Sequence, residues 1–432
     1  MVTWYFIYFS ANGCIKPFLV LLYRSRGLRE DQIGLLAALR PCIAFPAGAA
    51  WAYLADRRRW HRHILIFALV GATVFTLAQA AVRGVWATGA AVLLCEALGA
   101  PSGALIDAAV TATLARDPSQ GEYGRVRLFG ALGWGLAAAA GGLALSHLGW
   151  TPVFVAYAAL MAALLWPSLA ISFEDLTHRE RDVEDTAALV AQGIPVGHLA
   201  AADKDAAESR PSTGLDLVRD PAVLLFLATV TVMGYAVGTI ESFLFLLLDE
   251  LGGPPLLAGL TLTLTCTAEP IVFYFAGALL RALGTTGSLH VIFAAFSVRL
   301  ACYATLAAWP SPWLILPVEL LHGITFGLTW TVGTAWAAAN APAHLRATVQ
   351  SAFQGCYLGL GNGVGSLLGG QVYSRRGAPA TFWAALAVLA GGWALTSAAR
   401  LMLGRRRKGN GVAPVQGAEE GVRYARVEMV ER

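Results

Sequence analysis

The dominant pattern along the chain is a series of long apolar runs separated by short polar breaks. A helix of ~20 apolar residues spans the ~30 Å hydrocarbon core of a bilayer. A first set of six runs covers Thr3–Tyr23, Gln32–Leu54, Ile64–Val82, Trp86–Leu114, Arg125–Leu148 and Pro152–Phe173. A second set of six covers Ala222–Leu248, Leu256–Leu280, Leu289–Trp309, Trp313–Ala339, Val349–Tyr373 and Ala380–Leu403. The pattern predicts an all-α membrane protein with twelve transmembrane helices.

The two sets of runs predict two six-helix halves that are weak repeats of each other. The predicted parts are an N-terminal half (1–173), a linker (174–221), a C-terminal half (222–403) and a tail (404–432). The linker is rich in Asp, Glu, Arg and Ala, which is typical of a disordered cytoplasmic segment. Ala52–Arg59 closes the second span, and Gly277–Gly284 closes the eighth at the corresponding place. Parallel six-helix halves around a central site are the plan of one large class of transporters.

Composition supports the membrane assignment. The 432 residues are 57% hydrophobic and only 13% charged, whereas soluble domains are about 25% charged. The first apolar run begins almost at Met1 and lacks a basic leader or a cleavage site, so we expect it to act as its own insertion signal. The net charge of +4 is modest, and no nucleic-acid partner is expected.

Lysine and arginine in the short loops set the expected orientation. They cluster after spans two, four, eight and ten and in the tail, at Arg57, Arg58, Arg59, Arg62, Arg116, Arg281, Arg346, Arg405, Arg406, Arg407 and Lys408. These loops and both termini are therefore predicted to be cytoplasmic, in a multi-pass protein of the plasma membrane. Arginines on the opposite side weaken this assignment: Arg24, Arg26, Arg29, Arg375 and Arg376.

The sequence carries no sign of enzyme chemistry. Its cysteines all fall inside apolar runs and are expected to be buried free thiols without metal-ligand spacing: Cys14, Cys42, Cys95, Cys266, Cys302 and Cys356. Walker-type loops, HExxH and GxSxG motifs are absent from the sequence. We therefore expect neither catalysis, nor a metal, nor any cofactor beyond a coupling proton.

Ionisable residues stand inside three apolar runs of the C-terminal half. Glu269, Arg299 and His322 lie ~15–20 Å from the predicted outer ends of their runs, near mid-bilayer, and Glu319 lies one turn further out than His322 on the same face. Such groups normally face the bundle interior and pair there. We expect one network in which Glu269 exchanges a proton, Arg299 biases its protonation, and His322 is a hydrogen-bond partner or relay. The alternative is a static ion network that only fixes helix register.

The N-terminal half carries further charges inside its apolar runs. Lys16 and Arg40 each precede a proline, where a helix backbone is already interrupted. Glu96 is placed near the outer boundary of its span, and Arg125 at a cytoplasmic boundary. In the seventh span, Glu241 is expected to pair with a basic group that the sequence does not identify.

One aromatic residue lies near two of these N-terminal charges. Arg127 is two residues deeper than Arg125, and Trp134 follows it by seven residues, which is about two helical turns. An aromatic platform beside Arg127 and Asp107 suits a sugar or nucleoside ring, with stacking on one face and hydrogen bonds at the edge. The alternative is that Trp134 serves packing or anchors the helix at the membrane interface.

Two motifs and the buried charges resemble a known family. The segment Gly124–Gly135, GRVRLFGALGWG, closely resembles the start of the fifth helix in the lactose permease and nucleoside/proton symporter branch of the major facilitator superfamily. Ala55–Arg57 resembles the superfamily's signature loop after helix two. Glu269, Arg299 and Leu321–His322 fall where that branch keeps its coupling residues. The likeness extends over nearly the whole chain.

The resemblance implies the major facilitator fold and specific roles for individual residues. It implies substrate binding by Asp107, Arg127 and Trp134, proton coupling by Glu269, Arg299 and His322, and a gating loop with Asp56 and Arg57. The sequence departs from the permease pattern at three places. Thr325 replaces an acid one turn after the histidine, Val272 replaces an amide in helix eight, and Cys356–Gly359 lacks a lysine of helix eleven.

Together these features predict a secondary carrier in the lipid bilayer. We expect it to move a small polar solute, sugar- or nucleoside-like, by alternating access with proton symport. Thr325 and Val272 favour instead a facilitator or exporter without proton coupling. The acidic central segment and the charged tail suggest a third interpretation, a transporter-like receptor or scaffold. The oligomeric state is left open.

Overall fold

The structure of the chain is a computed structural model that describes residues 1–116, 123–171, 173, 220–340 and 346–409. Helices make up the regular structure, and no strand occurs among these residues. The predicted linker lies outside the described residues except for residues 220 and 221, and so does the tail beyond residue 409. The prediction of an all-α fold is confirmed.

Prolines divide two spans of the N-terminal half. Its segments are α1 (Val2–Ile15), the 3₁₀ turn η1 (Lys16–Phe18), α2 (Leu19–Ser25), α3 (Glu30–Arg58), α4 (His61–Ala78), α5 (Val85–Gly99), α6 (Pro101–Arg116), α7 (Tyr123–Leu148) and α8 (Trp150–Ala170). Pro17 lies in η1 between α1 and α2, and Pro101 separates α5 from α6. A proline lacks the N–H that would bond to the carbonyl four residues earlier. The carbonyl of Ala97, which Pro101 leaves free, instead accepts a hydrogen bond from the indole Nε1 of Trp51 at 2.9 Å.

Two spans of the C-terminal half are interrupted by π-helical segments. The elements are α11 (Pro221–Glu250), α12 (Pro255–Thr305), η3 (Leu306–Ala308), η4 (Pro312–Ile315), α13 (Leu316–Glu319), the π segment η5 (Gly323–Leu328), α14 (Thr329–Asn340), α15 (Arg346–Gln354), the π segment η7 (Gly355–Gly361) and α16 (Asn362–Gly409). π-helical turns are rare and occur frequently at functional sites.

The membrane spans agree with the predicted apolar runs, with one difference in their connections. Ten described segments are long and apolar enough to span a membrane, and two of them, Pro255–Ala308 and Thr348–Leu403, are 54 and 56 residues long. Each of these two turns at a single glycine with positive φ, Gly284 (φ 65°) and Gly377 (φ 77°). The sequence predicted a polar loop at each of these two places. The structure is instead helical up to the glycine, because a glycine with positive φ can reverse the chain without strain. Counting each long segment as two spans brings the ten to the predicted twelve.

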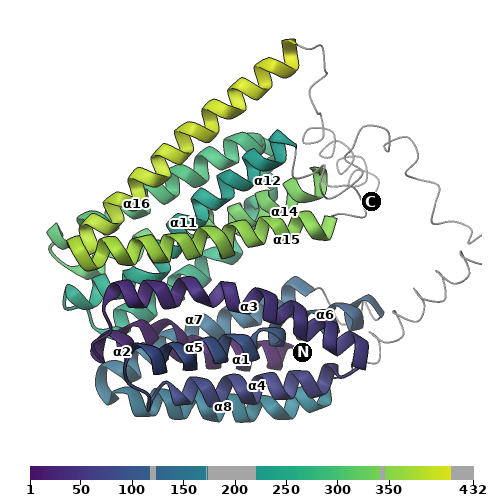
Figure 1. Cartoon of the computed structure of the whole chain (residues 1–432), viewed down its shortest axis with the longest axis vertical. Coiled ribbons are helices and arrows are strands. Elements are labelled where there is room, and N and C mark those ends of the chain that lie inside the picture. Colours follow the sequence, from purple (N-terminus) through teal and green to yellow (C-terminus); the bar gives the residue numbers. More distant parts are fainter. Residues whose placement is uncertain (117–122, 172, 174–219, 341–345, 410–432) are drawn as a thin grey trace, which may run out of the picture.

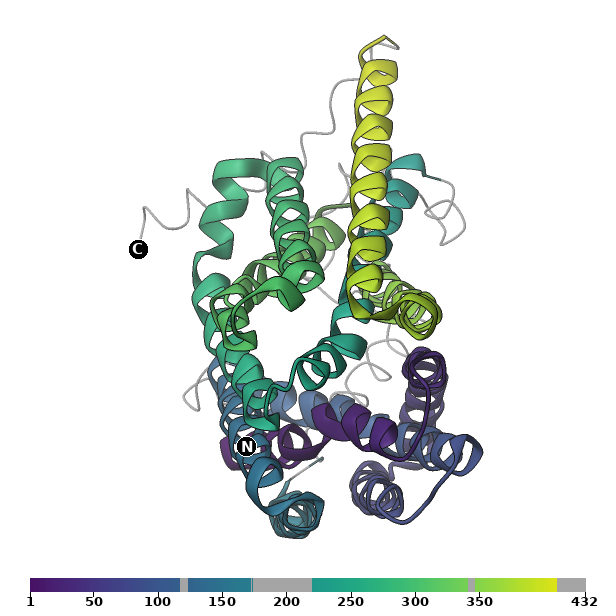
Figure 2. The same cartoon turned by 90° about the vertical axis from the view of Figure 1, so that its left-hand side faces the viewer.

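The two halves form two layers (Figure 1). The N-terminal half, purple to blue, lies below the C-terminal half, green to yellow, and Figure 2 shows the same division from the side. The layers meet where α7 packs on α12 and where α3 packs on α16. A Cβ added to Gly259 would stand 2.3 Å from the carbonyl oxygen of Ala138, so only glycine permits this backbone contact between the halves.

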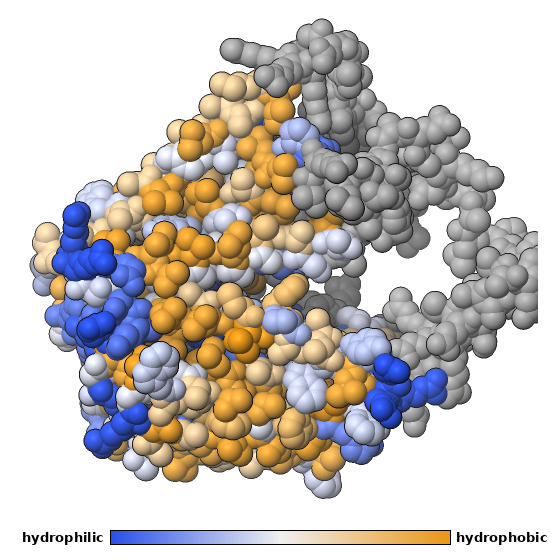
Figure 3. Space-filling model, viewed as in Figure 1, coloured by the Kyte–Doolittle hydropathy of each residue, from blue (hydrophilic) through white to orange (hydrophobic). Residues whose placement is uncertain are grey.

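The outer surface of both layers is apolar (Figure 3). On the face shown, hydrophobic residues cover most of both layers, while hydrophilic residues gather at the left edge and at the right end of the lower layer. Large apolar side chains are exposed on both halves, including Phe45 (68%), Trp166 (80%) and Leu395 (74%). A soluble monomer rarely exposes so much apolar surface. This belt is the surface expected to contact lipid in an integral membrane protein.

Candidate functional site

The ionisable residues of the C-terminal half come from three helical limbs that face one another. Glu269 lies on the first limb of α12, before Gly284, and Arg299 on the second limb. Glu319 ends α13, and His322 stands directly before the π segment η5. The turn at Gly284 folds α12 back, which brings Glu269 and Arg299 to one level although they are far apart along the helix.

These four residues form one continuous chain of contacts. The carboxylate Oε1 of Glu269 lies 3.0 Å from Nε2 of His322, and Nδ1 of His322 lies 3.3 Å from Nη1 of Arg299. Arg299 then donates through Nη2 to Oε2 of Glu319 at 3.0 Å. The expected network is therefore present in the structure. It differs from the expectation in one respect, because Arg299 pairs with Glu319 and reaches Glu269 only through His322.

The contact with Arg299 assigns different hydrogen-bonding roles to the two nitrogens of the His322 ring. Arginine has donors only, so Nδ1 of His322 must accept from Arg299. Nε2 then carries the ring proton and donates it to Glu269. A second proton on the ring would point at the guanidinium of Arg299. The carboxylate of Glu269 is therefore the acceptor at the more exposed end of this chain of contacts.

Burial divides the network into two pairs. The side chains of Arg299 and Glu319 are only 4% and 2% exposed, whereas those of His322 and Glu269 are 23% and 21% exposed. A buried pair of opposite charges that is also hydrogen-bonded holds its charges in place. The Glu269–His322 pair is open to exchange with its surroundings, and the Arg299–Glu319 pair is fixed.

Three further residues of the network were not identified from the sequence. Tyr303 donates to Oε1 of Glu319 at 2.6 Å and accepts from Nε of Arg299 at 2.9 Å. Thr325 accepts from Nη1 of Arg299 at 2.7 Å, and Tyr357 donates to the backbone carbonyl of Thr325 at 3.1 Å. Helical spacing could have identified two of these residues. Tyr303 follows Arg299 by four residues and Thr325 follows His322 by three, so each lies on the same helix face as its partner.

The two π segments meet at this network. Thr325 belongs to η5 and Tyr357 to η7. Tyr357 and its neighbours replace the lysine-bearing part of helix eleven in the permease pattern. The buried hydroxyl of Tyr357 ties the two interrupted spans together.

The predicted substrate-binding residues form a second cluster, in the N-terminal half. Nη1 of Arg127 lies 3.2 and 3.1 Å from the carboxylate oxygens of Asp107. The hydroxyl of Tyr5 also donates to Asp107. Phe9 lies under the Arg127 guanidinium at 5.8 Å and packs edge-on against Trp134 with ring centroids 6.4 Å apart. Asp107, Arg127 and Trp134 are thus brought together, with Tyr5 and Phe9 as additional members.

The remaining predicted charges have different surroundings. Arg40 pairs with Glu96 through contacts of 2.8 and 2.7 Å, and Lys16 lies nearby and interacts electrostatically with that carboxylate. The expected basic partner of Glu241 is not found in the described part of the chain, because its carboxylate accepts from the amide of Asn362 at 2.9 Å. An amide satisfies a carboxylate on an exposed helix face without an opposite charge.

The predicted gating residues lie at the end of α3. Asp56 contacts Nε2 of His61 at 3.0 Å, and Arg57 donates to the hydroxyl of Tyr53 at 3.0 Å. Arg59, which follows the helix, adopts a left-handed conformation with φ 55° and turns the chain toward α4. Asp56 therefore bridges the tight turn between α3 and α4, whereas the contact of Arg57 with Tyr53 stays within α3. The side chains of Arg125 and Arg346 lie outside the described residues.

The cysteines are free, as predicted, but not all are buried. Cys14 and Cys95 are buried, Cys266, Cys302 and Cys356 are intermediate, and Cys42 is exposed. The prediction that Cys42 is buried was wrong. Its side chain is not covered by another described helix, and an apolar run in a membrane protein does not require every side chain to be buried. Over the described residues, no group of three or more His, Cys, Asp and Glu is arranged to hold a metal ion.

The sequence is similar to a permease and to a major facilitator superfamily domain-containing protein. The chain is 28% identical to the maltose permease of Geobacillus stearothermophilus over 377 residues, which cover 86% of each protein. It is also 30% identical over 190 residues to a human major facilitator superfamily domain-containing protein 6-like, covering 44% of this chain and 32% of that protein.

Solved structures of transporters share the fold. The nucleoside transporter NupG superposes with a TM-score of 0.74 at 15% identity, covering 93% of this chain and 98% of that one. A mutant of the peptide transporter POT gives a TM-score of 0.63 at 15% identity and covers 94% of each chain. The family model described as the MFS_1 like family matches residues 1–384. The chain is therefore a member of the MFS_1 like family, with the fold of the major facilitator superfamily transporters.

Proposed function

We propose that this protein is a secondary active transporter that moves a small polar solute, sugar- or nucleoside-like, by alternating access with proton symport. One observation carries the proposal: a partly exposed carboxylate and imidazole are joined to a buried arginine–glutamate pair in an unbroken chain of hydrogen bonds. The similarity to a maltose permease supports a sugar, and the similarity in fold to NupG is compatible with a nucleoside.

In the proposed mechanism, Glu269 is the proton site. While the carboxylate is ionised, the Nε2–H of His322 bonds to it and holds the first limb of α12 against the span that carries His322. A proton on Glu269 neutralises this acceptor and weakens the charge-assisted bond. The buried Arg299–Glu319 pair keeps its charges and orients His322 throughout. Protonation thus changes how tightly two spans of the C-terminal half hold together.

A hydrogen bond between the halves links the proton site to the solute site. Thr263, on the same limb of α12 as Glu269, donates to the carbonyl of Gly135 at 2.7 Å. Gly135 follows Trp134 on α7, the helix that also carries Arg127. A shift of the first limb of α12 would therefore move the backbone beside Trp134. This contact is a direct route by which protonation and solute binding can influence each other.

Transport in liposomes tests the proposal. Purified protein should accumulate radiolabelled maltose or uridine when an inward proton gradient is imposed, and a protonophore should abolish the accumulation. Glu269→Gln should retain solute exchange without a gradient but should not accumulate solute. Asp249→Asn, at an exposed carboxylate at the end of α11, is the matched control and should behave as the wild type. Accumulation by Glu269→Gln equal to the wild type would refute proton coupling at this site.

The orientation is part of the same proposal. We expect both termini in the cytoplasm of a cell whose plasma membrane holds the protein, with the proton as the sole coupling ion. Uptake that is unchanged by a protonophore would favour instead the uncoupled facilitator suggested by Thr325 and Val272. A receptor or scaffold role through the linker concerns residues outside the described part of the chain, and no described contact favours it.

A further inference from the structure

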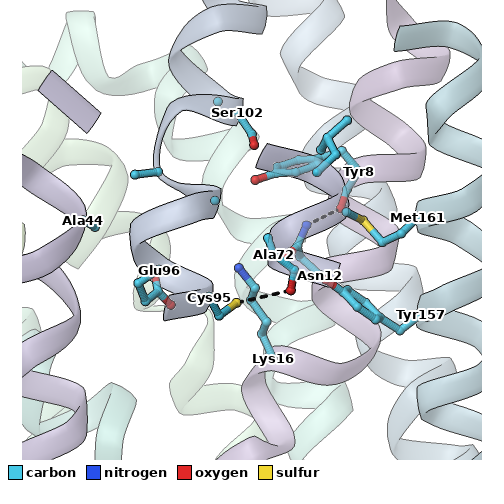
Figure 4. Close-up of a pocket in the computed structure, with 14 residues that line it drawn as sticks. Tyr8, Asn12, Lys16, Ala44, Ala72, Cys95, Glu96, Ser102, Tyr157 and Met161 are labelled. Carbon is cyan, nitrogen blue, oxygen red and sulfur yellow. Dashed lines mark hydrogen bonds between the residues drawn. The ribbon is translucent and has the colours of Figure 1, made fainter. Parts of the chain in front are cut away.

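A second polar cavity, separate from the Glu269 network, lies inside the N-terminal half (Figure 4). It measures about 280 Å³ and is lined by residues of α1, α3, α4, α5, α6 and α8 and by Lys16 of η1. One water molecule occupies ~30 Å³ of liquid, so the cavity has room for a small solute or several waters. Its polar lining comprises Tyr8, Asn12, Lys16, Glu96, Ser102 and Tyr157.

The spacing of residues on the first span directs its polar side chains into this cavity. Tyr8, Asn12 and Lys16 follow one another at intervals of four residues, so they lie on one face of the helix. The neighbouring residues Tyr5 and Phe9 point to an adjacent face, toward Asp107 and Arg127. The first span therefore presents one face to the solute cluster and another to the cavity.

The cavity carries an excess of positive charge. Glu96 is the only carboxylate in its lining, and Arg40 holds that carboxylate through contacts of 2.8 and 2.7 Å. The ammonium of Lys16 makes no hydrogen bond or ion pair with another described residue and interacts with Glu96 only at longer range. An ionised group at membrane depth normally has a direct partner. The two cations and one carboxylate leave one positive charge without a close counter-ion.

The same cavity contains donors without acceptors. The hydroxyl of Ser102 has no hydrogen-bond partner among the described residues, although Ser102 is only 1% exposed. The hydroxyl of Tyr8 likewise makes no hydrogen bond to the described residues. The amide of Asn12 donates one N–H to the carbonyl of Tyr8 at 2.7 Å and has a second one to offer. Buried polar groups in native proteins are nearly always hydrogen-bonded, so the Ser102 hydroxyl requires a partner, and Tyr8 and Asn12 have donors to offer to the same ligand.

We propose that this cavity binds a small anion, which is either the carboxylate of the transported solute or a free monovalent anion such as chloride. An anion would accept hydrogen bonds from Ser102, Tyr8 and Asn12 and would neutralise Lys16. If it belongs to the solute, the inference rests on the proposed function and narrows the substrate class to sugar acids and related carboxylates.

The position of the cavity suits a solute that also reaches the Arg127 cluster. Gly103 lines the cavity, and Asp107 lies one turn further along α6. Trp4 stacks on Tyr8 with ring centroids 4.7 Å apart, and the adjacent Tyr5 donates to Asp107. The cavity and the Asp107–Arg127 pair are therefore adjacent both along α6 and across the first span.

Equilibrium binding to the purified full-length protein in nanodiscs tests the inference without any proton gradient. The probes are sodium glucuronate, sodium acetate and sodium chloride at constant ionic strength, with methanesulfonate as the replacing anion and glucose as the neutral counterpart of glucuronate. A charge-assisted contact predicts at least about tenfold tighter binding of glucuronate than of glucose. Lys16→Met should reduce this ratio to near one, Ser102→Ala should reduce it severalfold, and Arg83→Met, an exposed cation of the same half, should leave it unchanged.

The outcomes separate the two sources of the anion. Binding of glucuronate that depends on Lys16 supports a solute carboxylate, and binding of chloride alone that depends on Lys16 supports a free anion. The inference is overturned if the wild type binds none of the three anions, or if Lys16→Met binds them as well as the wild type does. The wild-type comparison of glucuronate with glucose stands even if Lys16→Met fails to fold. Loss of proton-driven uptake would affect only the proposed function, because this assay uses no gradient.

Discussion

The two halves each hold an arginine–carboxylate pair, Arg299–Glu319 and Arg127–Asp107, and these pairs are organised in opposite ways. In the C-terminal half, Arg299 is hydrogen-bonded on every side and is almost completely buried. In the N-terminal half, Arg127 and Asp107 form a pair whose side chains are 49% and 35% exposed. The same types of residue are thus closed off in one half and open in the other.

This difference indicates a division of labour. A buried ion pair resists change, because removing either partner leaves an uncompensated charge. An exposed pair exchanges its partners readily, since water and solutes compete for its hydrogen bonds. The C-terminal half therefore holds a fixed ion pair beside the more exposed Glu269–His322 pair. Under the proposed function, the N-terminal half can release its exposed pair to an incoming solute.

The largest expected effect concerns the stability of the two arginines. Arg299→Met should lower the free energy of unfolding by roughly 3–5 kcal/mol because Glu319 would remain buried without its cation. Arg127→Met should change it by about 1 kcal/mol or less, since its pair is exposed. Thermal unfolding in detergent, followed by tryptophan fluorescence, measures both. Equal losses of stability would contradict the contrast between the halves.

The second prediction compares two carboxylates in transport. Glu269→Gln should abolish accumulation under a proton gradient while solute exchange continues, because the variant can bind solute but cannot release a proton. Asp107→Asn should impair accumulation and exchange alike, since it removes the negative charge that orients Arg127. Counterflow and gradient-driven uptake in the same liposome preparation distinguish the two. If both variants lose both activities, the assignment of separate roles is wrong.

The third prediction concerns the aromatic platform. Trp134→Ala should raise the dissociation constant of the solute by roughly two- to tenfold, the range expected when a ring contact worth ~0.5–1.5 kcal/mol is lost. Trp134→Phe should retain most of the affinity because a ring face remains. Trp166→Ala, at a tryptophan exposed on the outer surface, is the control. An unchanged dissociation constant in Trp134→Ala would assign this residue to packing.

The smallest expected effect belongs to an ion pair between the halves. Arg24 on α2 contacts Glu250 at the end of α11 at 2.7 Å, with side chains 27% and 32% exposed. Such a partly exposed pair should contribute at most about 1 kcal/mol. A double-mutant cycle with Arg24→Gln and Glu250→Gln, read by thermal unfolding, measures the coupling. A coupling energy as large as that of the Arg299–Glu319 pair would show that exposure does not set the strength of these contacts.

The sequence by itself determined the class of the protein and the four charged residues that meet in the C-terminal network. Apolar runs of bilayer length fixed the spans, because in hydrocarbon a helix alone satisfies its backbone within one segment. Depth along each run placed Glu269, Arg299 and His322 at one level, since the rise per residue is constant. The cost of burying charge then required that they meet.

Only the tertiary structure decided which groups are bonded to which. Arg299 pairs with Glu319 rather than Glu269, and Glu241 with an amide, because partners are set by the rotation and packing of helices that are distant in sequence. Tyr303 and Tyr357 join the network for the same reason. The cavity of the N-terminal half was also invisible in the sequence, since Lys16 and Ser102 line one space only when the first and fourth spans pack together. Depth follows from the chain alone, whereas the direction of a side chain depends on what surrounds it.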